Sequence, residues 1–154
     1  MLKKTFSIII LLLLPSCGYE AIHSQKNAIV YDFSINKIDF IGDRDVNSKI
    51  KKKLASYSFS KKEKDFVLNI SSSSEKIIIS KNISGNATSF KTKVTIDVKV
   101  LLDNVVKDNL QIIENFNYSN NTNNFDLKRY EKEIKINLAE TASNKLIFKL
   151  SNIQ

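Results

Sequence analysis

The most regular feature of the chain is an alternation of apolar and polar positions between Phe90 and Val100. One set of alternate positions holds Phe90, Thr92, Val94, Ile96, Val98 and Val100, and the other holds Lys91, Lys93, Thr95, Asp97 and Lys99. Successive side chains of a β-strand point to opposite faces of the sheet. The pattern therefore predicts a long strand with one wet face, and we expect Val94, Ile96 and Val98 in the core under the terminal helix.

Three further stretches have the pattern of strands. Residues 28–41 alternate apolar and polar side chains, which predicts a first strand. Phe66–Ile70 opens a second strand that passes through Ser71–Ser74 and resumes at Ile77–Ile79. The four serines weaken the pattern, so we expect an exposed or irregular middle. Leu110–Tyr118 is expected to return as the last strand of a meander.

The connections between these strands are polar. Residues 80–89, which include Gly85, predict a turn, and so do Asp103 and Asn104. Residues 119–124 read SNNTNN and predict a loop.

Two stretches have the spacing of amphipathic helices. Val46, Ile50 and Leu54 follow four-residue steps, and Asp43 or Asp45 can cap the start of that short helix. From Phe125 to about Leu150 there is neither Gly nor Pro, which indicates a long terminal helix. Its apolar positions are Leu127, Tyr130, Ile134, Leu138, Ala142 and Leu146.

The elements follow in the order strand, helix, three strands, helix. An arrangement that buries all their apolar faces is a two-layer sandwich, with two helices packed on one face of a four-stranded mixed β-sheet. We therefore expect an α+β fold in a single domain.

The N-terminus has the features of an export signal. Lys3 and Lys4 precede an apolar run from Phe6 to Leu14, and Pro15 ends that run. A membrane-spanning helix needs about 20 apolar residues, so the run is too short for a permanent span. We expect residues 1–16 to be a signal peptide that is removed.

The only cysteine of the chain, Cys17, follows this segment directly. Leu14-Pro15-Ser16-Cys17 resembles a bacterial lipobox, in which the cysteine receives acyl chains and becomes the membrane anchor. Gly18 follows, where lipoproteins kept in the inner membrane typically have Asp, so we expect an outer-membrane address on the periplasmic face. Residues 17–27 are then an acylated tether, and residues 28–154 form the domain. The alternative is an ordinary secretory signal with a chance cysteine.

The charge balance is basic, with +8 over 154 residues and +6 once Lys3 and Lys4 are removed. Export argues against nucleic acid as a partner, and so does the presence of only two arginines, Arg44 and Arg129, because specific phosphate and base readers favour the guanidinium fork. The lysines reflect either an AT-rich genome or an anionic envelope partner such as lipid phosphates.

No arrangement of residues indicates catalysis, a metal or a cofactor. Cys17 and the single histidine, His23, lie in the expected tether, which is unsuited to a Cys-His nucleophile. No calcium-loop motif and no glycine-rich phosphate loop occur. Asp43 and Asp45 are explained as acids at a helix start. We expect a protein that is not an enzyme.

The lipobox, the mature start Cys17-Gly18-Tyr19 and the Ala-, Leu- and acid-containing stretch Asn137–Ala142 of the terminal helix together resemble the LPS-assembly lipoprotein (LptE-like) family. The resemblance implies a non-enzymatic plug and assembly partner of the outer-membrane β-barrel LPS translocon (LptD-like), which contacts lipopolysaccharide. Of the family's residues, only Cys17 is carried over.

Two other functions remain open. One is an auxiliary lipoprotein of an ABC-type lipid transport system, and the other is a structural envelope lipoprotein. For contact with lipopolysaccharide we expect a cluster on the wet face and the adjoining turn, formed by Lys81, Lys91, Lys93 and Lys99. The alternative for these lysines is a solvated face that resists edge-to-edge pairing of sheets.

Overall fold

The computed structural model describes residues 31–59, 61–121 and 123–153, so the expected signal peptide, the tether and Cys17 lie outside the described residues. The elements are β1 (Ser34–Gly42), α2 (Arg44–Leu54), a 3₁₀ helix (Ala55–Tyr57), β2 (Asp65–Lys81), β3 (Ala87–Leu102), β4 (Val105–Ser119) and α3 (Asn124–Ser151).

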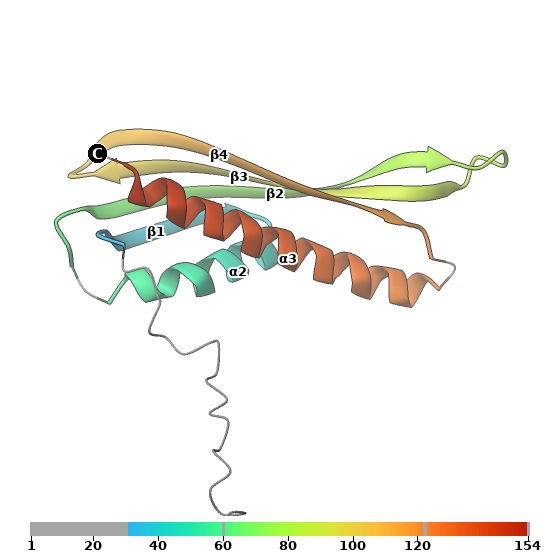
Figure 1. Ribbon diagram of the computed structural model, residues 1–154, viewed down its shortest axis with the longest axis horizontal. Coiled ribbons are helices and arrows are strands. Elements are labelled where there is room, and N and C mark those ends of the chain that lie inside the picture. The colour runs from blue at the N-terminus through green and yellow to red at the C-terminus, as the bar shows by residue number, and fades with distance from the viewer. Residues whose placement is uncertain (1–30, 60, 122, 154) are drawn as a thin grey trace, which may run out of the picture. The chain divides into compact units, whose positions relative to one another are not determined.

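The four strands form one mixed sheet in the order β1-β2-β3-β4. β1 runs parallel to β2, while the β2–β3 and β3–β4 pairs are antiparallel. Helices α2 and α3 lie side by side on the same face of this sheet, as Figure 1 shows. The predicted α+β sandwich of two helices on a four-stranded mixed sheet is confirmed.

Strand β3 lies in the interior of the sheet and provides much of the core. Val94 and Ile96 are fully buried and Val98 is 2% exposed, as the alternation predicted. Side chains of α3 cover this face, where Ala139, Ala142 and Leu146 are fully buried. The inner face of a central strand and the apolar stripe of the long helix thus form the main contact between the two layers.

Within the described part of the predicted strand 28–41, β1 begins at Ser34, and it contains an irregularity that the alternation alone did not indicate. Its pairing with β2 shifts by one residue between Ile35 and Lys37, which is a β-bulge. Ile35 is buried before the bulge, and Ile38 and Phe40 pack against the core after it. The extra residue allows positions of different parity to face the same layer.

Strand β2 is continuous, so of the expected exposed or irregular middle at the four serines, the irregular alternative is wrong and the exposed one holds for Ser71 and Ser73. Pairing with β3 runs without a shift from Phe66 to Ile78, and the irregularity comes after that point, between Ile78 and Ser80. Ser71 and Ser73 are exposed, but Ser72 is only 5% exposed. Serine is tolerated on the inner face because Ser72 and Ser74 bind polar groups at the start of α2.

The turns are tighter than predicted. The chain reverses between β2 and β3 over residues 82–86, where the Gly85 N–H donates to the Asn82 carbonyl over 2.9 Å. Asp103 and Asn104 both have positive φ, 51° and 62°, which suits a two-residue hairpin turn. That short turn lets β4 begin at Val105, well before the expected Leu110.

Gly42 closes β1 in a conformation that other residues rarely adopt. Its φ is +101°, and a Cβ at this position would lie 1.9 Å from the Ser72 carbonyl oxygen. The next residue, Asp43, donates its N–H to the same oxygen over 3.1 Å. The absence of a side chain at Gly42 therefore allows the chain to stay close to β2 while it turns into α2.

We expect Gly42→Ala to lower the free energy of unfolding by more than the roughly 1–3 kcal/mol that a strained backbone alone costs. The added cost comes from the contact with Ser72. Gly85→Ala is the matched control, because Gly85 has φ +81° but open space around the new Cβ. Urea unfolding of both variants measures the difference, and equal losses would contradict the role of the close approach.

Candidate functional site

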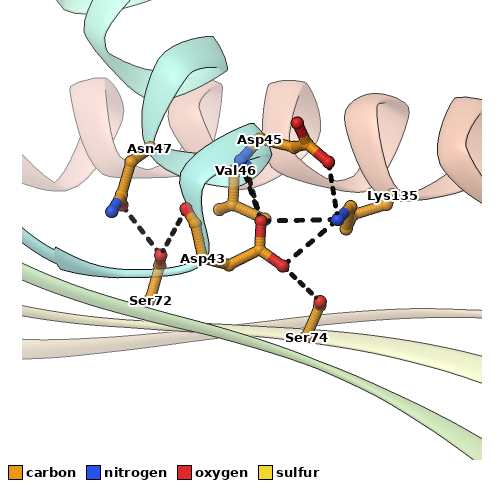
Figure 2. A network of polar contacts seen from close by, with 7 residues as sticks. All are labelled: Asp43, Asp45, Val46, Asn47, Ser72, Ser74 and Lys135. Atoms are coloured by element: carbon orange, nitrogen blue, oxygen red, sulfur yellow. Dashed lines mark hydrogen bonds and ion pairs between the residues drawn. The ribbon is translucent and has the colours of Figure 1, made fainter.

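A network of polar contacts centred on Asp43 joins α2, α3 and β2 (Figure 2). The Asp43 Oδ1 atom accepts the N–H groups of Asp45, at 2.9 Å, and of Val46, at 3.1 Å. Its Oδ2 atom accepts the Ser74 hydroxyl over 2.6 Å and lies 3.2 Å from Lys135 Nζ. Asp43 is thus both the N-cap of α2 and a contact between the two layers.

Lys135, in the middle of α3, bridges two carboxylates. Its Nζ lies 2.8 Å from Asp45 Oδ2 in addition to its contact with Asp43. Burial disfavours the charged ammonium, but the hydrogen bonds to Asp45 and Asp43 outweigh it and raise the pKa of Lys135 above its ordinary value. The charged form is therefore the one that the fold favours.

The two carboxylates shift in the opposite direction. Burial alone would raise the pKa of Asp43, but hydrogen bonds from Ser74, Val46 and Lys135 outweigh it, so that the pKa of Asp43 lies below its ordinary value. The hydrogen bond and charge of Lys135 likewise lower the pKa of Asp45. All three groups are thus held in their charged forms.

A pocket of about 340 Å³ lies next to this network, between α3 and the inner face of the sheet. Its basic groups come from β2 and from successive turns of α3: Lys76, Lys128, Lys132 and Lys135. Asp45, Glu75 and Glu131 are the acidic residues that line it. The pocket is therefore polar and mixed in charge.

The lysines of this pocket differ in how far they are paired. Lys76 Nζ lies 2.5 Å from Glu131 Oε1 and 3.8 Å from the centre of the Phe90 ring. Tyr118 donates its hydroxyl to the same Glu131 oxygen over 3.0 Å. Within residues 31–59, 61–121 and 123–153, Lys128 and Lys132 form no ion pair and are exposed. Those two cations are the ones available to an anionic group.

The lysines singled out from the sequence lie elsewhere. Lys91, Lys93 and Lys99 are on the face of the sheet turned away from the helices, because they alternate with buried residues of β3. Lys81 ends β2. Lys91 and Lys93 are two positions apart, but Lys99 lies about 20 Å further along the strand. Lys93 Nζ is also 4.0 Å from Glu75 Oε2. The structure thus brings Lys91 and Lys93 together but separates Lys99 from them.

The pocket lysines were missed, although the sequence carries part of the signal. Lys128, Lys132 and Lys135 are spaced by four and three residues, which places them along one side of a helix. Their neighbour Lys76 belongs to a strand far away in the sequence, and only the fold brings it to them.

The described part of the chain lacks the features of two other kinds of site. Among these residues no group of three or more His, Cys, Asp or Glu side chains is placed to hold a metal ion. None of the described helices combines the length and the apolar character needed to cross a membrane.

No protein-family model matches the chain, and no curated protein matches it by sequence. The fold, however, is similar to solved structures of bacterial lipoproteins. The crystal structure of rare lipoprotein B from Shewanella oneidensis matches with a TM-score of 0.55 and 14% identity, over 76% of this chain and 98% of that chain.

Two more structures agree. A minor lipoprotein from Acinetobacter baumannii matches with a TM-score of 0.60 and 12% identity, over 80% of this chain and 93% of that one. Lipoprotein B from Nitrosomonas europaea matches with a TM-score of 0.52 and 11% identity, over 75% and 81%. At such identities the likeness establishes the fold, and it places this chain among proteins with the architecture of these lipoproteins.

Replacing Lys135 with Met should lower the free energy of unfolding at neutral pH by about 1.5–3 kcal/mol, the range for hydrogen bonds to charged groups. The lowered pKa values of Asp43 and Asp45 mean that the stabilisation is fully present above their ordinary value of 3.8 and is lost as the pH falls through the folded values. The gap between variant and parent should therefore shrink below about pH 3.8.

The raised pKa of Lys135 keeps the same stabilisation in place up to its ordinary value of 10.5, and it is lost only as the pH rises through the folded value. Denaturant unfolding from pH 3 to 8 measures the difference, with Lys128→Met as the exposed control on the same helix. A gap that stays constant across this range would contradict the ion-pair interpretation.

Proposed function

We propose that this chain is a lipoprotein anchored through acylated Cys17 to the periplasmic face of the bacterial outer membrane, where it is the plug and assembly partner of a β-barrel that delivers lipopolysaccharide. The observation that carries the proposal is the coincidence of two independent features. A lipobox-like segment, Leu14–Cys17, precedes a domain whose fold matches bacterial lipoproteins over most of its length.

The anchor follows from the chemistry of the single thiol. Cys17 has no second cysteine in the chain with which to form a disulfide. Acylation removes the reactive thiol and adds apolar chains, and each buried methylene contributes about 0.8 kcal/mol to membrane binding. Two or more chains give a stable anchor, which leaves the polar domain on the aqueous side.

A non-catalytic role is supported by how the polar groups of the domain are used. Asp43 and the acids that line the pocket, Asp45, Glu75 and Glu131, are each paired with a lysine of the fold itself. Their shortest contacts join elements of the sandwich and so stabilise the arrangement of α3 on the sheet. We propose that the protein acts by binding.

Contact with lipopolysaccharide is supported by the distribution of lysines. Lys91 and Lys93 lie on the open face of the sheet near the β2–β3 turn, with Lys81 at the end of the neighbouring strand. Phosphate groups of an anionic lipid are attracted to such a cluster, with about 1 kcal/mol for each lysine near the surface. The partnership with the barrel rests on the sequence resemblance to the LPS-assembly lipoproteins.

Affinity purification of the protein from detergent-solubilised outer membranes tests the proposal. We expect a large heat-modifiable barrel to co-purify, and we expect mass spectrometry to find acyl chains on Cys17. The Cys17→Ala variant should remain unprocessed or appear in the soluble periplasmic fraction, because it lacks the lipid anchor.

Other outcomes identify the alternatives. Inner-membrane transporter subunits in place of a barrel would overturn the proposed partner in favour of an ABC-type transport system. Peptidoglycan-associated partners would favour a structural lipoprotein. An unmodified N-terminus on the mature wild-type protein would contradict the anchor itself.

Joint replacement of Lys81, Lys91 and Lys93 with Ser should weaken lipopolysaccharide binding by about 3 kcal/mol at low salt and by less at high salt, because ions screen exposed charges. Isothermal titration at two salt concentrations measures the change.

A variant with the same loss of charge elsewhere, Lys51, Lys52 and Lys107 to Ser, is the control, since these lysines are exposed on other parts of the domain. Equal weakening by both variants would show that net charge alone matters. Unchanged binding by the first variant would place the contact elsewhere.

A further inference from the structure

Part of strand β2 is an open edge of the sheet. β1 pairs with β2 only as far as Gly42, which lies opposite Ser72, whereas β2 continues to Lys81. In the portion of the chain that the structure describes, no strand lies beside residues 73–81 on this side. Figure 1 shows the β2–β3 hairpin extending beyond the end of β1.

The direction of the backbone groups along this edge follows from Ser72. Its carbonyl faces the β1 side, where it accepts the N–H of Asp43 over 3.1 Å. The N–H and C=O of one strand residue point to the same side, and they alternate along the strand. Ser74, Lys76 and Ile78 therefore direct both groups to the open edge. The ladder with β3 is regular up to Ile78, so these groups are evenly spaced.

The open edge exposes three neighbouring apolar side chains. Ile77, Ile78 and Ile79 are consecutive, and they are 40%, 49% and 47% exposed. Residues of a strand alternate between faces, so both faces of the edge offer a branched side chain to a neighbour. Branched apolar pairs across adjacent strands stabilise a sheet.

The other two edges of the sheet carry features that block strand addition. β1 contains the bulge after Ile35 and places the charged Lys37 and Asp39 beyond it. β4 also exposes apolar side chains, but its pairing with β3 shifts by one residue at Lys107, and it carries the charged Lys107, Asp108 and Glu114. Bulges and charges are the usual means by which proteins protect an edge. From Ser74 to Ile78, β2 has no bulge and one charge pair, Glu75 and Lys76.

Acidic and basic side chains both lie near the open edge, but Asp45, Glu75 and Glu131 are each paired with a lysine of the fold, which leaves, among the described residues, unpaired lysines on both faces. On the helix side, the exposed Lys128 and Lys132 line the pocket that Ser74 and Lys76 also border. On the opposite face, Lys91 and Lys93 lie on β3 directly across from Ile77 and Glu75. A strand added at this edge would have lysines near it on both faces, which favours acidic side chains.

We propose that the edge of β2 from Ser74 to Ile78 binds an extended, acidic segment of a partner protein as an additional β-strand. The backbone groups of the edge provide the pairing, the isoleucines provide apolar contacts, and the flanking lysines select for carboxylates. A second copy of this chain is disfavoured as the occupant, because pairing of two such edges would place Lys76 and Lys81 of one copy close to the flanking lysines of the other. The inference goes beyond the proposed contact with lipopolysaccharide, with which it shares Lys91 and Lys93.

A fluorescently labelled synthetic peptide of alternating glutamate and valine residues tests the proposal. We expect saturable binding to the full domain by anisotropy, with amide exchange slowed at Ser74, Lys76 and Ile78. Ile78→Pro removes one N–H of the edge and should weaken binding by about tenfold or more. Ile78→Thr keeps the N–H group and the branched shape, so it should bind nearly as the parent does.

The peptide itself provides controls that leave the protein unchanged. The same peptide N-methylated at every backbone nitrogen cannot donate to the edge, so it should not bind. Its analogue with lysine in place of glutamate should bind at least tenfold more weakly, about 1.4 kcal/mol. Equal binding by the N-methylated peptide, or by Ile78→Pro with its fold intact by circular dichroism, would overturn strand addition.

The oligomeric state tests whether a second copy of this chain occupies the edge in place of another protein. Sedimentation of the parent at the concentrations of the binding assay should give a monomer. A dimer that Ile78→Pro converts to monomer, together with no peptide binding by the parent, would assign the edge to a second copy and overturn the proposed partner.

Discussion

The sandwich depends on one sharp passage of the chain, from the end of β1 into the first turn of α2. At Gly42 the backbone lies against Ser72 too closely for any side chain. One residue later, Asp43 caps α2, accepts the Ser74 hydroxyl and meets Lys135 of α3. A single carboxylate thus fixes the start of one helix, its height above β2 and its contact with the other helix. The groups keep their charges because their hydrogen bonds and ion pairs outweigh the cost of partial burial.

The elements that were predicted well from the sequence are those in which the apolar residues follow a single period, two residues in a strand or 3.6 in a helix. In β3 the alternation from Phe90 to Val100 matches the burial of the inner face. In α3 the absence of Gly and Pro indicated a single uninterrupted helix, as the structure has it. The bulge in β1 and the serines of β2 could not be predicted in the same way. The bulge depends on the pairing with β2, and Ser72 and Ser74 are acceptable inside only because α2 begins above them.

The candidate binding residues also differ in how far their arrangement could be predicted from the sequence. Lys91 and Lys93 share a face because they belong to one regular strand, so their proximity was predictable. Lys99 shares that face but is too distant to act with them. The pocket between Lys76 and α3 depends on the packing of two elements that are far apart in the sequence. Cys17, the residue with the most specific sequence signal, lies outside the described residues, and its acylation stays a prediction.

The parallel pairing of β1 with β2 has a consequence for the order in which the chain acquires structure. The hairpin turns of the meander join strands that follow one another directly, so their loops close at low entropic cost. β1 instead meets residues about thirty positions away, as in the bond from Ser34 to Asp65, 31 residues apart, with α2 enclosed between them. Synthesis proceeds from the N-terminus, so β1 is made before β2, the strand with which it pairs. Phe33 and Ile35, which are buried in the folded domain, therefore remain exposed to water until β2 is available to pair with β1.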